Sequence, residues 1–309
     1  MKFILPTTVL GSASLVVAWG DLGHRTVGYL AQHYFTDAAN QYVNDLIRPS
    51  DTFDISDAAV WPDKARNYPE YKYTANWQFI DAQDDPPNAC NVNYKRDCEG
   101  ENGCIISALV NQTAVLQDSS ADAKTRQDAI KFILHFIGDI HQPLHTEAID
   151  RGGNQIKVSF DGKHSEKLNL HEVWDTEILN KLNGLKRDPK GPEEKQAAQE
   201  WADKLFQAAG GSSNFNISAA RNGQLCDSSN NAQDCVLEYA TETNALVCNY
   251  VLAPRLDWLE SNDLGGEYYA AAVPIVEDRI TKAGQRLAVW VNALATQTQG
   301  VVVQKQDLK

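Results

Sequence analysis

The sequence predicts a single all-α domain with one small β-hairpin, and three observations favour this fold class. Apolar residues recur at helical spacing in several separate stretches. Alternation of apolar and polar residues, which is typical of strands, is scarce, and its best example, Asn154 to Phe160, predicts a short hairpin strand. The sequence shows neither an internal repeat nor a convincing linker. The helical stretches are residues 27–34, 129–140, 173–182, 200–208, 236–251 and 275–294.

The two ends of the chain differ from this pattern. Lys2 precedes an apolar run without acids, and Val16-Val17-Ala18 suits a signal peptidase, so we expect a signal peptide over residues 1–18. An uncleaved anchor is the alternative, although the run is too short to span a bilayer permanently. The domain is then expected to cover 19–296, followed by a flexible polar tail over 297–309. No later segment is apolar for long enough to span a membrane, so we expect a secreted, extracellular protein.

Cysteines and sequons fit such export. The six cysteines are an even number, which favours three disulfides in an oxidising compartment. Two pairs are close enough in sequence to close small loops, which leaves the remaining two to join distant parts of the chain. The hypothetical pairs are Cys98 with Cys104, Cys226 with Cys235, and Cys90 with Cys248. Sequons at Asn111 and Asn216 suit glycosylation, or are chance matches.

The net charge of −13 excludes a protein that binds nucleic acid through a broad basic face. Loss of Lys2 with the leader would make the charge one unit more negative. If the protein acts on phosphodiesters, the attraction must be local, and bound metal is its most direct source.

The segment FILHFIGDIHQPLH, Phe132 to His145, is the most informative for chemistry. His135 and Asp139 are four residues apart, so they share a helix face, yet their neighbours are Phe, Ile and Leu. A buried carboxylate is costly unless it is paired or binds metal, and for this pair alone the two readings are equally favoured. Pro143 ends the helix, which allows His145 to point back from the following turn.

His171 and Asp175 in HEVWD repeat the four-residue spacing, although a pair at this spacing also arises by chance. Taken singly, His24 is an ordinary helix-start residue and Asp63 a helix cap or first-turn acid. The whole set of imidazoles and carboxylates, however, suits zinc.

The order of these motifs resembles that of the fungal and plant zinc-dependent single-strand nucleases, which are distantly related to bacterial zinc-dependent phospholipases C. The resemblance runs from Trp19 to about Ala293 and implies a helical fold of this phospholipase C/nuclease kind. The motifs are WGxxGH at 19–24, WPD at 61–63, HFIGDIHQPLH at 135–145, GGN at 152–154 and HEVWD at 171–175.

The resemblance implies three zinc ions as cofactors and assigns their ligands. One zinc would take Asp63, His135 and Asp139. The second would take the α-amine and carbonyl of Trp19 together with His24, and would share Asp139. The third would take His145, His171 and Asp175.

The resemblance also assigns catalytic roles to Asp63, Arg66 and Asn154, of which the last two would hold the scissile phosphate. Phe79 would stack on a nucleobase and Asp81 would bind its edge, although without the resemblance Phe79 reads as a core residue. A base must leave its duplex to stack in this way, which implies a preference for single strands.

Two positions depart from the family pattern. Gln78 stands where the family has a zinc-ligating His, and a neutral amide oxygen is a weaker zinc donor, so we expect at most a weak ligand. Arg151 stands at the base site where relatives often have a small apolar residue, and it can stack on the base or hold a neighbouring phosphate. The Cys226/Cys235 pair is an addition to the two disulfides usual in the family.

The expected function is therefore that of a secreted zinc-dependent endonuclease on single-stranded DNA and RNA. It would leave 5′-phosphorylated products, would also remove the 3′-phosphate of nucleotides, and would act as a monomer without an obligate protein partner or a membrane. One alternative is a phospholipase C-like phosphodiesterase, which needs an exposed apolar rim. The other is a degenerate relative that binds zinc or nucleotides without turnover, which Gln78 keeps open.

Overall fold

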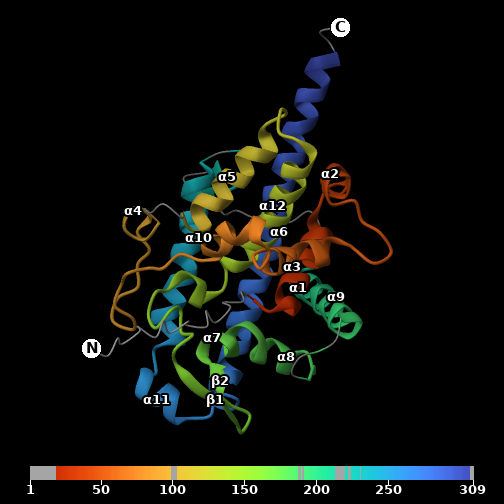
Figure 1. The fold of residues 1–309 in the computed structure, drawn as a ribbon. Helices are drawn as coiled ribbons and strands as arrows, with labels where there is room; N and C mark the ends of the chain where they lie inside the picture. The colour runs from red at the N-terminus through yellow and green to blue at the C-terminus, as the bar shows by residue number, and fades with distance from the viewer. Residues whose placement is uncertain are drawn as a thin grey trace, which may run out of the picture.

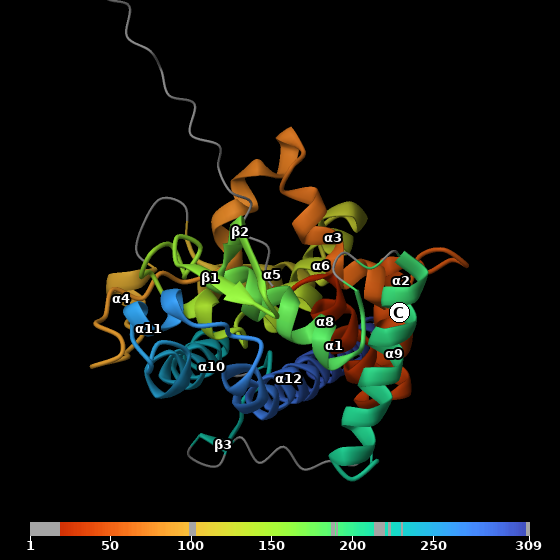
Figure 2. The same cartoon turned by 90° about the horizontal axis from the view of Figure 1, so that it is seen from below.

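The computed structural model describes residues 19–98, 103–186, 189, 191–212, 220–221, 224–229 and 231–306. The predicted leader and Asn216 lie outside these residues. Within them the chain is predominantly helical, as the sequence predicts, and α12 (Glu267–Gln306) runs the length of the molecule (Figure 1). Helix α1 (Asp21–Tyr34) packs against α12, α9 (Gly191–Ala208) and α3 (Ile55–Ala65), and Figure 2 shows it between α12 and α3.

The other helical segments include α6 (Ala123–Asp139), which packs on α3 and α5. The α-helices are α2 (Asp37–Ile47), α4 (Tyr94–Asp97), α5 (Ile105–Gln117), α7 (Leu170–Glu172), α8 (Ile178–Leu182), α10 (Ala232–Leu246) and α11 (Leu256–Ser261). The 3-10 helices are η1 (Pro69–Gln78) and η2 (Pro143–Thr146), and the π-helical segments are η3 (Val173–Glu177) and η4 (Val247–Val251).

Local sequence explains where α6 begins and what it buries. The Asp122 side chain accepts hydrogen bonds from the backbone N–H groups of Lys124 and Thr125, which satisfies donors that have no partner inside the helix. From Ala129 to Asp139 every residue of α6 is buried, because this half of the helix lies inside the core. The polar members of that half, Lys131, His135 and Asp139, are therefore carried into the interior.

The predicted hairpin is present. Strand β1 (Lys157–Phe160) pairs antiparallel with β2 (Lys163–Asn169) through the two-residue turn Asp161-Gly162. Both turn residues have positive φ, 52° and 70°, which matches the twist of a tight hairpin. A second pair, β3 (Ala220–Arg221) and β4 (Gln224–Leu225), is shorter. Strand β2 leads directly into α7, which carries His171.

The six helical stretches predicted from apolar spacing all lie in helical segments, with Ile140 just past the end of α6. Helices α2, α3 and α5 were not predicted. Helix α12 continues to Gln306, beyond Thr296, where the sequence places the start of a flexible tail.

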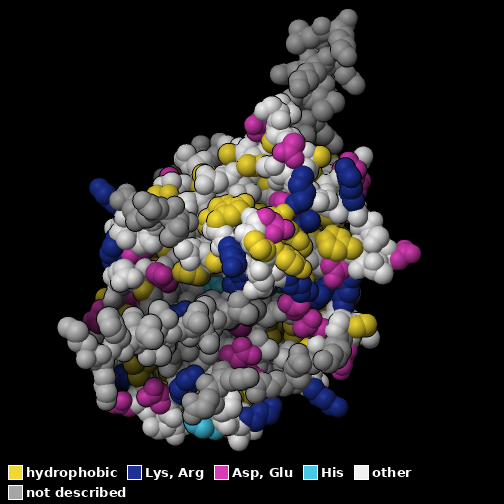
Figure 3. All heavy atoms as spheres, in the orientation of Figure 1, with side chains coloured by type: hydrophobic (Ala, Val, Ile, Leu, Met, Phe, Trp, Pro, Cys, Tyr) yellow, Lys and Arg dark blue, Asp and Glu magenta, His cyan; other side chains and the backbone are white. Residues whose placement is uncertain are grey.

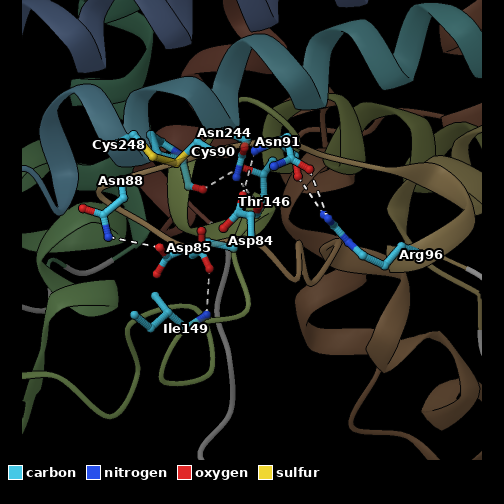
Figure 4. Close-up of a disulfide and its surroundings, with 12 residues drawn as sticks. Asp84, Asp85, Asn88, Cys90, Asn91, Arg96, Thr146, Ile149, Asn244 and Cys248 are labelled. Atoms are coloured by element: carbon cyan, nitrogen blue, oxygen red, sulfur yellow. Dashed lines mark hydrogen bonds between the residues drawn. A yellow bond between two sulfur atoms is a disulfide. The ribbon is translucent and has the colours of Figure 1, made fainter.

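All three predicted disulfides are confirmed. Cys90–Cys248 joins the loop that precedes α4 to η4, beside Asn244 and Thr146 (Figure 4). Long-range cross-links of this kind restrict the unfolded chain and hold a loop that is poor in regular structure. Among the described helices, none has the length and mean hydropathy that crossing a membrane requires.

Candidate metal centre and adjoining pocket

A first group of metal-ligand side chains gathers from α1, α3 and α6. Asp139 lies between two imidazoles, with Oδ1 3.1 Å from His24 Nε2 and Oδ2 3.2 Å from His135 Nε2. Asp63 Oδ1 is 3.7 Å from His135 Nε2. The two imidazole rings stack with their centroids 3.8 Å apart. The structure thus brings together four residues that are up to 115 positions apart in the sequence, from His24 to Asp139.

A second group lies where η2, α7 and η3 meet. His145 Nε2 is 3.1 Å from His171 Nε2, which is 3.0 Å from Asp175 Oδ2. Pro143 starts η2 after the short link 140–142 that follows α6, and this turn carries the His145 side chain into the interior. All three residues are buried.

Backbone carbonyls orient three of the imidazoles. A carbonyl oxygen only accepts hydrogen bonds, so each ring carries its proton on Nδ1 and directs the lone pair of Nε2 at its donor group. The Nδ1 atoms donate to carbonyl oxygens at these distances: His135 to Ala59 at 2.7 Å, His145 to Gln78 at 2.8 Å, and His171 to Gly152 at 2.5 Å. This is the arrangement that metal-binding histidines adopt in proteins.

Burial controls the charge of both groups. It lowers the pKa of His24 to about 4, lowers the pKa of His135, and holds the pKa of His145 well below its usual range. The same burial raises the pKa of Asp139 well above its usual range and raises the pKa of Asp175. The imidazoles are thus kept neutral, as metal binding requires, while the carboxylates lack the positive charge that would stabilise them.

The donor atoms fit a divalent metal. Both carboxylate oxygens of Asp139 and both ring nitrogens of His24 are fully buried and have no hydrogen-bond partner in the described part of the chain. Buried polar atoms are normally satisfied, so a bound cation explains this cluster better than an apolar core does. Nitrogen and carboxylate donors in this mixture suit zinc.

Trp19 is anchored between the two groups. Its indole Nε1 donates to the Gly138 carbonyl at 2.9 Å, next to Asp139, and the adjacent Gly20 N–H donates to the Asp175 carbonyl at 2.9 Å. Gly138 is required for this packing, since a Cβ there would lie 2.9 Å from His24 Nδ1.

Gln78 and Arg66 border the first group and are both buried. Gln78 Nε2 donates to Asp63 Oδ1 at 3.0 Å and lies 3.3 Å from His135 Nε2. Its amide oxygen accepts a hydrogen bond from Arg66, whose Nη2 is 3.3 Å from Asp63 Oδ1. Gln78, which stands where the family has a zinc-ligating His, therefore contacts the first donor group. It directs its amide nitrogen, not its amide oxygen, toward Asp63 and His135.

A cavity of about 210 Å³ adjoins the second group. His171 forms part of its wall and is also a member of that group. The apolar lining comes from Phe79, Leu144, Ala148 and Gly152, and the polar lining from Asp81, Gln83, Glu147 and Arg151. The predicted base-binding residues Phe79, Asp81 and Arg151 therefore share one pocket.

Asn154 lies in the turn beside this pocket. Its Nδ2 donates to the Arg151 carbonyl at 2.9 Å, so its side chain helps to fix the turn. The predicted glycosylation residue Asn111 is exposed on α5.

Sequence reasoning missed Glu147 as a pocket residue. The Glu147 carboxyl is buried beside the carboxyl of Asp84, and burial raises the pKa of Glu147 to about 8. Cys90, which completes this cluster, is in a disulfide and is no metal ligand. A single Glu in a loop carries no spacing signal that would have identified it.

A helical fold with two buried groups of imidazoles and carboxylates, the second of which adjoins a pocket, is typical of metal-dependent hydrolases. Residues 19–296 match the model of the S1/P1 Nuclease family, and the chain belongs to this family, as the motif resemblance predicts.

Three relatives illustrate the similarity. The chain is 38% identical over 277 residues to Nuclease PA3 of Penicillium sp, covering 89% of this chain and 97% of the relative. It is 36% identical over 305 residues to Nuclease S1 of Aspergillus oryzae, covering 96% and 99%. It is 31% identical over 297 residues to Endonuclease 3 of Arabidopsis thaliana, covering 94% and 93%. The similarity thus extends over nearly the full length of both partners.

Proposed function

We propose that this nuclease is a secreted, zinc-dependent endonuclease that cleaves single-stranded DNA and RNA to 5′-phosphorylated products and also removes the 3′-phosphate of nucleotides. One observation carries the proposal: His171 is both a member of the second donor group and a wall of the Phe79 pocket. A base held in this pocket has its own phosphate next to the metal donors. The similar proteins are nucleases and an endonuclease by name, which supports the same activity.

Three zinc ions are the proposed cofactors, with the ligands given by the family resemblance. Asp63, His135 and Asp139 would hold the first, and Asp139, His24 and the α-amine and carbonyl of Trp19 the second. His145, His171 and Asp175 would hold the third. The two clusters of buried donors support this assignment. Zinc, when bound, supplies Lewis acidity that activates water and neutralises charge on the leaving oxygen.

The chain's own residues would bind and orient the substrate. Arg66, whose guanidinium borders Asp63, is proposed to hold the scissile phosphate together with Asn154. Phe79 would stack on the base, and Asp81 would accept hydrogen bonds at its edge. Because the pocket admits a base only after it leaves its duplex, single strands are the preferred substrates.

The remaining proposals concern the whole protein. We propose a leader over 1–18, a catalytic domain over 19–296, and a monomeric extracellular form with sugar on Asn111 and Asn216. Three disulfides support an oxidising compartment, and the exposure of Asn111 is compatible with glycosylation.

The test measures metal content per chain, the release of 5′-nucleotides from single-stranded and duplex DNA, and the release of phosphocholine from phosphatidylcholine. We expect three zinc ions and release from the single strand. His171→Ala should remove zinc and activity, whereas His33→Ala, a histidine that pairs with Asp203 on the surface, should change neither. Hydrolysis of the lipid instead of DNA, or full zinc without hydrolysis, would refute the proposal.

A further inference from the structure

The rim of the Phe79 pocket carries two side chains of opposite charge, Asp81 and Arg151. Both line the same pocket, and each lies within the electrostatic reach of the other. Limited hydration raises the pKa of Asp81 and nearby Asp97 adds to the rise, whereas Arg151 is close enough to oppose it. A ligand edge that enters this pocket therefore meets hydrogen-bond acceptors on one side and donors on the other.

The backbone holds both residues in place before any ligand binds. Arg151 has a φ of 59° in a tight turn, where its N–H donates to the Ala148 carbonyl at 3.0 Å. On the other wall, Ala82 accepts a hydrogen bond from the Ala148 N–H at 3.3 Å, which ties the segment of Asp81 to the segment of Arg151.

A hydrogen bond and a disulfide near these walls also restrict their movement. Asn244 Nδ2 donates to the Thr146 carbonyl at 2.9 Å, and the Cys90–Cys248 disulfide lies beside this bond (Figure 4). The backbone of the pocket is therefore fixed before a ligand binds, and the positions from which its polar side chains extend determine which ligand fits best.

We propose that Asp81 and Arg151 together make this pocket selective for guanine. The inference rests on the proposed function, since it names the base that the nuclease site prefers. Guanine has two adjacent donors, N1–H and N2–H₂, that match the two oxygens of a carboxylate. It also has two adjacent acceptors, O6 and N7, that match the fork of an arginine. Phe79 stacks on the face of any base and does not contribute to the choice.

The other bases match this pair of charges less well. Adenine and cytosine offer the carboxylate one amino group next to a ring nitrogen that is itself an acceptor, which leaves the second carboxylate oxygen facing a lone pair. Uracil and thymine offer a single N–H between two carbonyl oxygens. In each case Asp81 gains one hydrogen bond where guanine supplies two.

The experiment measures the Kd of the zinc-loaded protein for 5′-GMP, 5′-AMP, 5′-CMP and 5′-UMP by calorimetry. We expect 5′-GMP to bind about tenfold more tightly than the others. Two analogues separate the contacts: 5′-IMP lacks the N2 amino group, and 7-deaza-GMP lacks the N7 acceptor. Each should bind about fivefold to tenfold more weakly than 5′-GMP.

Variants then assign each contact to its residue. Asp81→Asn should remove the difference between 5′-GMP and 5′-IMP while keeping the penalty for 7-deaza-GMP. Arg151→Val should keep the difference between 5′-GMP and 5′-IMP and remove the penalty for 7-deaza-GMP. Arg151→Lys keeps the charge but lacks the paired donors of the guanidinium, so it should restore only part of that penalty. Thermal unfolding checks that these rim variants fold.

The outcomes distinguish this inference from the function on which it rests. Hydrolysis of single-stranded DNA with equal affinity for the four nucleotides would overturn guanine selectivity and leave the nuclease assignment standing. The same holds if 5′-IMP and 7-deaza-GMP bind as tightly as 5′-GMP. Absence of both nucleotide binding and hydrolysis would overturn the proposed function and this inference with it.

Discussion

Gln78 touches both the first donor group and Arg66, so its replacement tests how the centre holds metal. An imidazole is a stronger zinc donor than an amide oxygen. Gln78→His should therefore raise zinc retention against a chelator and leave or improve turnover. Asp139→Asn should abolish both, because Asp139 contacts His24 and His135. Zinc per chain, measured during titration with a chelator, gives the first readout independently of activity.

Two results would change this view of Gln78. If Gln78→His alters neither zinc retention nor rate, the residue acts outside the coordination sphere, as its hydrogen bond to Arg66 allows. If the wild-type protein carries its full zinc but cleaves nothing, the chain is a binding relative without turnover. The structure holds the Gln78 carbonyl on His145 in either case, so the variant should still fold.

The proposed role of the Trp19 α-amine would make removal of the leader a chemical requirement for activity. One zinc is proposed to use the α-amine of this residue, and an amide nitrogen in an unprocessed chain is a poor donor. A form with one extra Met before Trp19 should therefore contain less zinc and cleave single-stranded DNA more slowly than the mature protein. Equal zinc content and equal rates in the two forms would remove the α-amine from the site.

At the scale of helices, Asp57 links three elements. Its Oδ1 accepts from Arg25 of α1 at 2.8 Å, and its Oδ2 accepts from Lys195 of α9 at 2.7 Å and from the Asp54 N–H at 3.0 Å. Although burial opposes ionisation, the hydrogen bonds from Lys195 and Arg25 outweigh it and lower the pKa of Asp57 to about 2. The charged carboxylate thus joins the start of α3 to α1 and α9.

This linkage predicts how stability depends on pH. The folded pKa lies below the unfolded value of about 3.9, so the stabilisation is complete above that value and is lost as the pH falls toward 2. Asp57→Asn should lower the free energy of unfolding by about 1–2 kcal/mol at neutral pH and by much less near pH 2. Denaturant titrations in chelator avoid contributions from zinc release.

Asp203→Asn is the matched control, since Asp203 of α9 pairs with His33 of α1 on the surface. Its effect should stay within about 0.5 kcal/mol, as is usual for exposed pairs. An equal loss of stability at both pH values for Asp57→Asn would show that its charge is not the source of the linkage.

The sequence predicts some elements well because their burial pattern is local. Helix α6 combines apolar periodicity with an aspartate cap and a proline just beyond its end, and each feature acts within a few residues. Helix α3 was missed because Pro62 interrupts its pattern, although its capping box at Asp54 and Asp57 is a recognisable start. Helix α5 is largely apolar on several faces, which weakens the helical period.

For the candidate site, the sequence likewise predicts the ligand side chains but not the contacts that orient them. The imidazoles and carboxylates of both donor groups were named from motifs, and the structure brings them together. The carbonyls of Ala59, Gln78 and Gly152 that orient the imidazoles were not predictable, because every residue has a carbonyl. The contact between Arg66 and Gln78 likewise depends on the path of the chain through η1, which no short pattern encodes.

At the scale of the whole molecule, the charge distribution indicates that nucleic acid is attracted at one site and not by the surface as a whole. The net charge is −13, and on the face shown in Figure 3 Lys and Arg side chains are interspersed with Asp and Glu. A phosphate backbone that approaches such a surface meets both signs of charge. Attraction must then come from the metal centre and from the few cations beside it, such as Arg66 and Arg151.

This distribution predicts a weak salt dependence of oligonucleotide binding. The slope of log Kd against log salt counts the phosphates that a protein neutralises, at about 0.7 per contact for single strands. A centre that engages one phosphate directly and one or two neighbours should give a slope of about 1–2 for a single-stranded oligonucleotide of around ten residues.

The measurement uses a non-hydrolysable phosphorothioate strand and the zinc-loaded protein. Arg151→Val should lower the slope by less than one unit, because one cation is removed. A slope as steep as those of proteins that make six or more phosphate contacts would mean that substrate is held along an extended basic track, contrary to the charge distribution seen here.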